Sequence, residues 1–195
     1  MKITIFKVSL ITVALASLLS VTACSKSSSS AAENQKSAGA VALSVIKGSK
    51  IKTFSIEQLK ELPNLSGYAG QVDDNNKISG PDQYKGVALG DILDTIGGIT
   101  TSDRVKIIAS DNNTRIFSYD QIATGNIDIF DAISGQSTTA PVMVPKLFIA
   151  FEINEAPLDA ASGPLEFGIM TCQFRVTRDS LWIKKVAKIE VIPAQ

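Results

Sequence analysis

The sequence predicts an α+β domain in which mixed β-sheets are accompanied by a few short helices. Apolar segments rich in branched and aromatic residues recur along the chain and are typical of strands. Two Ser-x-x-Gln patterns and one apolar segment with helical spacing predict three short helices. Many strands with few helices favour the α+β class, and the roughly 155 residues after position 40 are enough for one domain with a core.

The first 23 residues are predicted to be a lipoprotein signal peptide. Lys2 and Lys7 give a basic start, and the 16 residues of Val8–Ala23 carry no charge. A membrane-spanning helix needs about 20 predominantly apolar residues, whereas a secretory signal has a shorter apolar core that ends in small residues. The end of this segment, Val21-Thr22-Ala23-Cys24, resembles the lipobox of bacterial lipoproteins, which implies cleavage before Cys24 and acylation of that residue, for example by palmitate. The alternative is an ordinary cleaved signal with an unrelated cysteine nearby.

Residues 24–40 are predicted to be the lipid anchor and a Ser/Ala-rich tether. Ser25–Ala40 contains no aromatic and no branched aliphatic residue, so it cannot bury enough apolar surface to offset the entropy of ordering. We therefore expect a domain at residues 41–195, held outside the cytoplasm on the cell membrane or the outer membrane. By resemblance to lipoprotein sorting patterns, Ser25 favours the outer membrane in a cell that has one.

Composition excludes several classes of function. The sequence contains no histidine, which excludes His-based acid–base catalysis and histidine ligation of zinc or haem. Without residues 1–24, which hold two lysines and no acids, 17 basic and 19 acidic residues leave a net charge of −2, which gives no electrostatic case for nucleic acid as a partner. The nucleophile elbow of hydrolases and a phosphate-binding Gly-rich loop are also absent from the sequence. With Cys24 acylated, Cys172 cannot form an internal disulfide, and we expect it to be a buried structural thiol.

The domain is predicted to open with a hairpin and a helix. Val41–Ile46 and Ile51–Phe54 are β-prone, and Lys47–Lys50 supplies the turn between them. Ser55–Gln58 has the pattern of a capping box, so we expect a short helix that ends near Pro63.

Residues Asn64–Gln83 are predicted to be a long polar connection. Its Asp/Asn run, Asp73–Asn76, invites a calcium interpretation, but the glycine and the final glutamate of an EF-hand loop are out of place. We therefore expect a solvated turn within a long loop, and loops of this length are often functional.

The rest of the domain is predicted to combine strands with two further helices. Apolar residues of Leu89–Ile96 have helical spacing, and Gly97-Gly98 ends that helix. Ser118–Gln121 repeats the capping-box pattern and starts the other helix. The remaining predicted strands are Val105–Ala109, Thr114–Phe117, Val142–Ile153, Leu165–Thr171 and Leu181–Ile192.

Four segments of the domain form a recognisable series. They are Phe54–Leu59 after the hairpin, Tyr84–Leu93, Glu152–Leu158 with Gly163–Leu165, and Ile183–Val191. In order and spacing they resemble the molybdopterin-binding domain of the sulfite oxidase family, whose helix entry reads aromatic-x-Gly-Val-x-Leu-x-Asp-Leu-Leu. The resemblance runs from about residue 41 to residue 191 and implies the sulfite oxidase-type molybdopterin-binding fold.

Departures from that family bear on function. The family binds molybdenum through a cysteine thiolate in the connection before its Gly-Val-x-Leu motif, but here that connection, Ser66–Asn75, contains no cysteine. Lys184 keeps the lysine of the family's closing Val-Lys-Trp, whereas Lys185 replaces the tryptophan, and Glu166 stands where the family tends to have arginine. A relocated ligand at Cys172 is the alternative to a structural thiol. We therefore assign no catalytic and no metal-ligating residue.

The sequence favours a ligand-binding or protein-interaction module over an enzyme. In this interpretation the molybdopterin-type domain has lost its metal chemistry, needs no cofactor, and uses the former cofactor cleft for a small anionic ligand. The alternative is a molybdopterin-dependent oxidoreductase that holds its cofactor without the usual cysteine. A structural domain that contacts another envelope protein is a third hypothesis. The candidate pocket residues are Tyr68, Arg115, Tyr119, Arg175, Arg178 and Lys184. For any single one of them, a solvated charge or a hydrogen-bonded tyrosine is the simpler interpretation.

Overall fold

The computed structural model describes residues 39–139 and 143–193. The predicted signal peptide, Cys24 and all but the last two residues of the tether lie outside the described residues. Within the described part, 49% of the residues form strands and 13% form helices, so the fold is β-rich. The predicted α+β class is therefore wrong. Its helices exist, but they have only five or six residues each and form no layer of their own.

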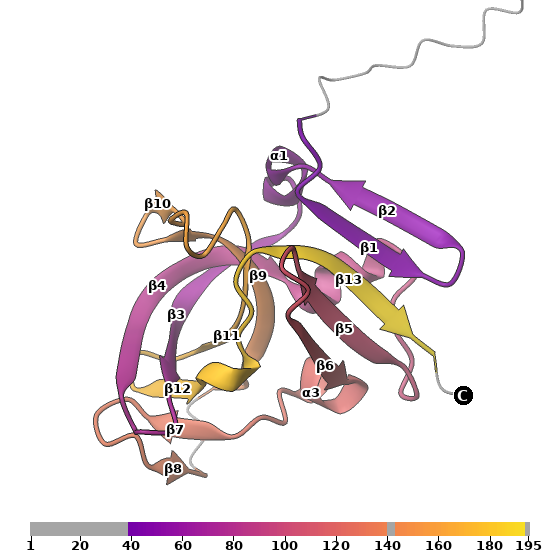
Figure 1. Ribbon diagram of the computed structural model, residues 1–195. Coiled ribbons are helices and arrows are strands. Elements are labelled where there is room, and N and C mark those ends of the chain that lie inside the picture. The colour runs from indigo at the N-terminus through magenta and orange to yellow at the C-terminus, as the bar shows by residue number, and fades with distance from the viewer. Residues whose placement is uncertain (1–38, 140–142, 194–195) are drawn as a thin grey trace, which may run out of the picture. The chain divides into compact units, whose positions relative to one another are not determined.

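A five-stranded sheet contains the first and the last strand of the domain (Figure 1). Strand β1 pairs antiparallel with β2 and parallel with β13, and β13 continues antiparallel to β5 and β6. The predicted opening hairpin and the predicted strands near residues 105 and 114 are confirmed in this sheet. Its strands are β1 (Leu43–Lys47), β2 (Lys50–Phe54), β5 (Arg104–Ala109), β6 (Thr114–Ser118) and β13 (Val186–Ile192).

Four strands of a second, eight-stranded sheet close into a barrel. Strand β3 (Asn64–Val72) pairs with β4 (Ile78–Ala88), and β4 pairs with β9 (Lys146–Ile153). Strand β9 then pairs with β11 (Glu166–Thr171), which returns to β3 and completes the ring. The other strands of this sheet are β7 (Ile129–Asp131), β8 (Ser137–Thr138), β10 (Ala156–Pro157) and β12 (Arg175–Arg178).

The helices are short and begin where the sequence predicts. Helices α1 (Ile56–Lys60) and α3 (Tyr119–Thr124) each follow a complete capping box, in which a serine hydroxyl and a glutamine side chain accept each other's backbone N–H groups. Helix α2 (Leu89–Asp94) is followed by Gly97 and Gly98 with φ of 100° and 65°. A 3₁₀ turn, η1 (Asp179–Leu181), precedes β13. No helix within the two described ranges combines the length and apolarity that crossing a membrane requires.

The long polar connection predicted for residues 64–83 is instead the paired strands β3 and β4. Its polar side chains fit strands because much of this hairpin alternates between exposed and partly buried positions. Only the predicted turn survives: the Asp73 carboxylate accepts hydrogen bonds from the backbone N–H groups of Asn75 and Lys77, both at 2.8 Å. The resulting hairpin supplies half of the barrel strands, and it is the main reason why the fold is β-rich and not α+β.

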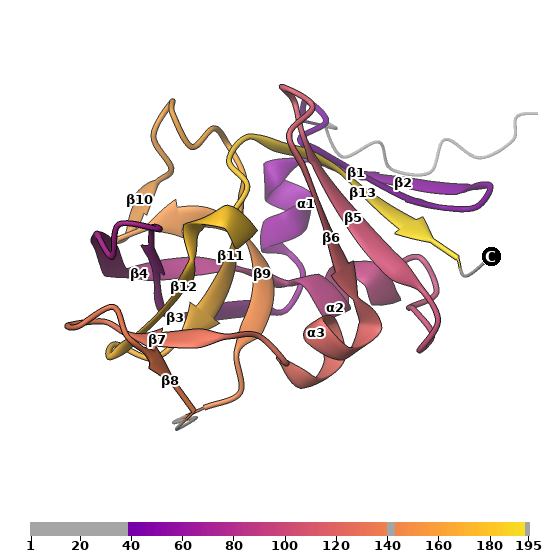
Figure 2. The ribbon, with the colours of Figure 1, turned by 60° about the horizontal axis from the view of Figure 1, so that its bottom comes forward.

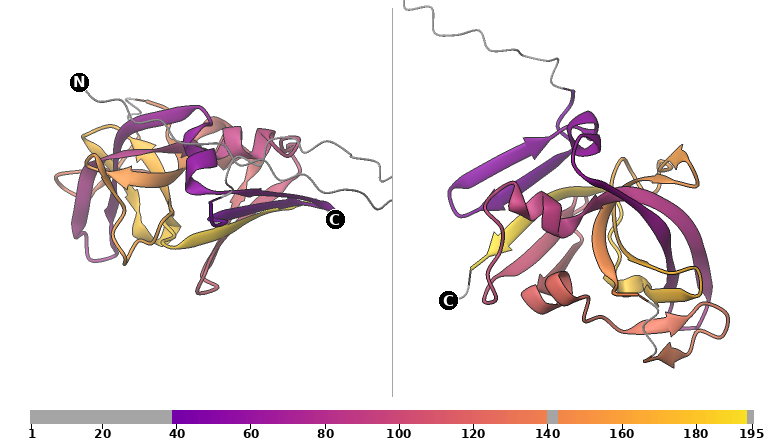
Figure 3. Two further views of the ribbon diagram at one scale, coloured as in Figure 1. Left: turned by 90° about the horizontal axis from the view of Figure 1, so that it is seen from above. Right: turned by 180° about the vertical axis from the view of Figure 1, so that it is seen from behind.

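Two main apolar clusters hold the described part of the domain together, beside a third, smaller one of Val72, Phe130 and Val176 on β3, β7 and β12. The larger lies between the five-stranded sheet and the outside of the barrel, and it includes Val45, Ile189, Ile149 and Phe167. The helices lie on this same side of the five-stranded sheet, as Figures 2 and 3 show. The other main cluster fills the barrel with Ala69, Tyr84, Phe148, Ala150, Met170 and Trp182.

Candidate functional site

A polar cleft of about 570 Å³ lies where the β3–β4 turn, the β5–β6 turn and the segment after β12 meet. Each of these three segments brings charged side chains to it. Three carboxylates and three cationic side chains line the cleft, so its field is mixed and not simply cationic. The lining residues are Gln71, Asp74, Asp111, Asn113, Arg115, Ala161, Asp179, Ser180, Trp182, Lys184 and Lys185.

Arg115 is held in the wall of the cleft by hydrogen bonds from two of its three guanidinium nitrogens. Its Nε donates to the Ser180 carbonyl, and its Nη1 donates to the Asn113 side chain at 3.1 Å and to the Thr114 carbonyl at 2.8 Å. The bond to Ser180 joins β6 to η1. Since a guanidinium has five N–H donors, Nη2 retains donors that a ligand can use.

The floor of the cleft is the edge of Trp182, which is only 5% exposed. Its indole Nε1 donates to the Thr177 hydroxyl at 2.9 Å, and its ring centroid lies 5.7 Å from that of Tyr84 inside the barrel. A Cβ at Gly168 would lie 2.5 Å from the Trp182 ring, so the ring reaches this position only because β11 has a glycine there. Trp182 therefore separates the cleft from the barrel interior.

Glu166 is a carboxyl buried at the start of β11, with 2% of its surface exposed. Burial raises its pKa from the usual range to about 7, and the charge of Asp159 adds to the rise, while Lys184 and the Ser162 side chain oppose it. Burial, together with the negative charges of Glu166, Asp82 and Asp159, raises the pKa of Tyr84. Glu166 and Tyr84 are thus an electrostatically coupled buried pair, and Glu166 also interacts with Lys184 of the cleft.

The loop between β10 and β11 forms another wall. The Asp159 carboxylate accepts the backbone N–H of Ser162 at 2.7 Å, and this hydrogen bond lowers the pKa of Asp159. The Ser162 carbonyl in turn accepts the N–H of Lys185 at 2.7 Å. The loop is thereby joined to the segment that carries Lys184, so the wall and its lysines form one connected unit.

Of the six predicted pocket residues, the structure brings Arg115 and Lys184 together in the cleft, with Arg178 beside it. The Arg178 guanidinium donates to the Asp73 carbonyl at 3.0 Å, lies 4.0 Å from the Asp74 carboxylate and stacks 4.3 Å above the Phe130 ring. Arg178 thus supports the turn that carries Asp74 and does not face the cleft itself.

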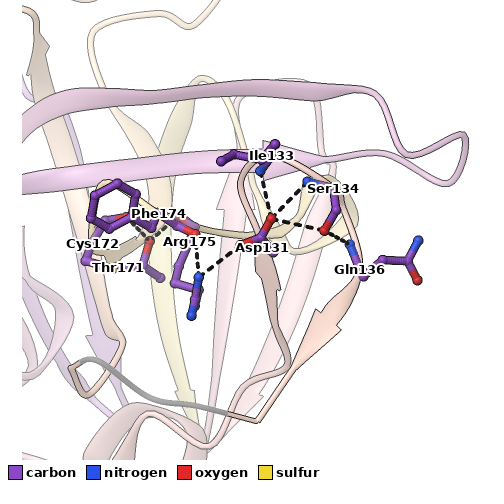
Figure 4. A network of polar contacts seen from close by, with 8 residues as sticks. All are labelled: Asp131, Ile133, Ser134, Gln136, Thr171, Cys172, Phe174 and Arg175. Atoms are coloured by element: carbon purple, nitrogen blue, oxygen red, sulfur yellow. Dashed lines mark hydrogen bonds and ion pairs between the residues drawn. The ribbon is translucent and has the colours of Figure 1, made fainter.

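The other three predicted residues lie elsewhere. Tyr68 is on β3 and Tyr119 begins α3, and neither lines the cleft. Arg175 lies in a separate network, where its Nη1 is 3.2 Å from Asp131 Oδ2 (Figure 4). The second Asp131 oxygen accepts the backbone N–H groups of Ser134 and Ile133, and these hydrogen bonds lower the pKa of Asp131. This network shapes the β7–β8 turn.

The donor set of the cleft does not fit a molybdenum–thiolate centre. Its lining contains no cysteine, and Cys172 is on the turn between β11 and β12, beside the Arg175 network of Figure 4. Cys172 is free and partly exposed, and the expectation of a buried thiol is therefore wrong. Within residues 39–139 and 143–193, no three His, Cys, Asp or Glu side chains are placed to hold a metal ion.

Sequence reasoning missed the three residues beneath the cleft, which are Tyr84, Glu166 and Trp182. Glu166 was noted only as a replacement for arginine. The signal that could have found it is a lone acidic residue within the apolar run Leu165–Met170, because a charge is rarely placed in a buried strand without a reason. Trp182, the single tryptophan of the chain, had no comparable signal.

Comparison with known proteins adds no assignment. The sequence matches no family model, and a search of curated proteins also finds no match.

Proposed function

We propose that this chain is a lipid-anchored envelope protein whose domain binds a small polar ligand with an anionic group in the cleft. The observation that carries the proposal is that hydrogen bonds hold the guanidinium of Arg115 in the cleft wall while its Nη2 keeps N–H donors for a ligand. A guanidinium in a fixed orientation binds a carboxylate or phosphate in a bidentate manner, and it loses little further entropy on binding. Lys184 and Lys185 add two more cations to the same cleft.

The carboxylates of the cleft narrow the class of ligand. Asp74, Asp111 and Asp179 line it together with the three cations, so a simple dianion meets repulsion as well as attraction. A ligand that carries an anionic group and also amine or hydroxyl donors satisfies both sets of side chains. Amino acids and hydroxy acids have this chemistry.

Binding without catalysis is the simpler account of this cleft. Ser180 supplies the only hydroxyl among its lining residues, and the sequence has no histidine to activate it. Its lining has no thiol that could act as a nucleophile or hold molybdenum. The proposal therefore includes neither a catalytic step nor a cofactor.

Thermal unfolding of the purified mature protein with glutamate, malate or inorganic phosphate tests the binding proposal. A ligand at a concentration of one hundred times its dissociation constant stabilises the folded protein by about 2.7 kcal/mol. This raises the melting temperature by roughly 5–10 °C for a domain of this size. We expect this rise with glutamate or malate and its loss in the double variant Arg115→Gln/Lys184→Gln.

The matched control is Arg104→Gln, because Arg104 is an exposed arginine on β5 that does not line the cleft. Arg104→Gln should keep the ligand-induced rise. If none of the three compounds raises the melting temperature of the wild-type protein, or if the double variant responds like wild type, the binding proposal is wrong.

The anchor is tested separately by mass spectrometry of the mature N-terminus. We expect cleavage before Cys24 and a mass increase that corresponds to acylation. Cleavage at another residue, or an unmodified Cys24, would refute the anchor and leave the cleft proposal intact.

A further inference from the structure

The five-stranded sheet has two faces of different composition. The inner face packs on the main apolar cluster, whereas the opposite side chains form what we call the outer sheet face. Strand register places one complete row on it, Ile51–Ile46–Glu190–Lys106–Ile116, with one residue from each strand. The neighbouring rows add Thr53, Ser44, Lys188, Ile108 and Thr114, and then Ile192, Arg104 and Ser118.

The outer sheet face is amphipathic and basic. Five of its residues are isoleucines: Ile51 and Ile116 on the edge strands are 68% and 52% exposed, Ile46 and Ile192 are partly exposed, and Ile108 is 9% exposed. Its charged residues are Arg104, Lys106 and Lys188 against Glu190, which gives a net charge of +2. Exposed aliphatic side chains interspersed with lysine and arginine are what a protein uses to rest on an anionic membrane surface.

No described element covers this face. The apolar cluster that includes residues of α1 and α2 lies on the inner side of the sheet, and the left view of Figure 3 shows the helices on one side only. Within the described ranges no helix therefore lies over the outer sheet face, and its edge strands leave Ile51 and Ile116 exposed.

The proposed acylation of Cys24 would tie this sheet to a membrane through a short segment. Cys24 lies nineteen positions before Leu43, the first residue of β1. A segment of nineteen residues reaches at most about 65 Å when fully extended, and about 25 Å on average as a coil. Because the segment after the proposed anchor leads directly into β1, the five-stranded sheet is the part of the domain closest to that anchor along the chain.

We infer that the outer sheet face is a docking surface for an anionic lipid bilayer. The inference rests on the proposed acylation of Cys24 and adds an orientation to it. The acyl chains hold the protein on the membrane, and the isoleucines and basic residues then turn the outer sheet face toward the bilayer. Arg115 points to the inner side of the sheet, because it pairs with the buried Ile107. The cleft therefore stays open to solvent when the outer face is docked.

Lysine footprinting of the acylated full-length mature protein tests this orientation. The protein is reconstituted into vesicles of phosphatidylcholine with phosphatidylglycerol, or of phosphatidylcholine alone, and acetylated with a lysine-specific reagent. In the anionic vesicles we expect severalfold slower acetylation of Lys106 and Lys188. Lys77 and Lys146 are exposed outside this face and should react equally in both kinds of vesicle.

A pair of variants separates apolar docking from loss of fold. Ile51→Ser/Ile116→Ser should abolish the protection of Lys106 and Lys188 with an unchanged circular dichroism spectrum. Ile133→Ser is the control, because Ile133 is an 86% exposed isoleucine in the β7–β8 turn, and it should leave the protection intact.

The outcomes distinguish the inference from the proposal on which it rests. An acylated protein whose Lys106 and Lys188 react equally in all vesicles overturns the docking surface and leaves the anchor intact. Protection that appears in detergent on addition of an envelope extract, without lipid vesicles, also overturns it and indicates a protein partner. An unmodified Cys24 refutes the anchor itself.

Discussion

Glu166 is a buried carboxyl at the start of β11. Burial raises its pKa to about 7, and Lys184 only partly offsets that effect. The unfolded chain has an ordinary carboxyl with a pKa near 4.5. Between these two values the folded state therefore binds more protons than the unfolded state, and the free energy of unfolding falls as the pH rises.

We predict that Glu166→Gln removes this pH dependence. Glutamine is neutral at every pH, so the variant avoids burying a charge above pH 7. Between pH 5 and pH 8 the wild-type protein should lose roughly 2–3 kcal/mol of stability relative to the variant. Urea unfolding at several pH values across this window measures the difference.

Glu190→Gln is the matched control, because Glu190 is a partly exposed glutamate on β13. It should follow the wild-type pH dependence. Parallel curves for wild type and Glu166→Gln between pH 5 and pH 8 would contradict the buried, proton-binding state of Glu166.

At the level of elements, the barrel depends on a close approach of β4 and β9. A Cβ at Gly86 would lie 2.2 Å from the Ile149 carbonyl oxygen and 2.9 Å from Ala150 Cα. These are backbone atoms of the paired strand and cannot move aside alone. We predict that Gly86→Ala lowers the free energy of unfolding by about 1–3 kcal/mol or more, as measured by urea unfolding.

Gly90→Ala provides the opposite case in the next element. Gly90 lies in α2, and a Cβ there meets no atom within 4 Å. Because alanine is the better helix former, this variant should gain about 0.5–1 kcal/mol. Equal effects of the two substitutions would show that strand approach at Gly86 does not limit the barrel.

The elements that sequence could predict are those that local chemistry decides. Both capping boxes, the end of α2 at its glycine pair and the opening hairpin follow from residues within a few positions of each other. Strands β3 and β4 could not be found in this way, because Asn64–Gln83 is rich in Asn, Asp, Gly and Ser. Its strands exist because each one finds partners on both sides in the closed barrel.

The cleft was even less accessible to sequence reasoning. The sequence identifies Arg115 and Lys184 as candidates by their charge alone. The fold brings them together because β6 and the segment before β13 both border the cleft. Arg175 carries the same guanidinium as Arg115, but the fold places it beside Asp131, outside the cleft. Charge can be read from one residue, whereas a shared cleft depends on the pairing of strands far apart in sequence.

On the scale of the whole domain, one core joins the sheet and the barrel. The main apolar cluster contains Val45 and Ile189 from the sheet with Ile149 and Phe167 from the barrel. Since neither part can expose its side of that cluster without the other, we expect a single cooperative unfolding transition.

The prediction is that fluorescence of Trp182, which reports the barrel, and far-ultraviolet circular dichroism have the same urea midpoint. Hydrogen exchange of β5 amides, which reports the five-stranded sheet, should give the same free energy of opening. Two separate midpoints, or a sheet that opens far more readily than the barrel, would show that the shared core does not couple them.

The parallel pairing of β1 with β13 has a consequence for the order in which the molecule is made. Ser44 pairs with Lys188, so β1 cannot form its parallel pairing until β13, the central strand of the sheet, has been synthesised. A ribosome delivers β1 early, yet the five-stranded sheet cannot close until nearly the entire chain has been synthesised. Such long-range contacts slow folding. A chain that ends before β13 leaves the β1–β2 hairpin and the β5–β6 hairpin without the strand that joins them.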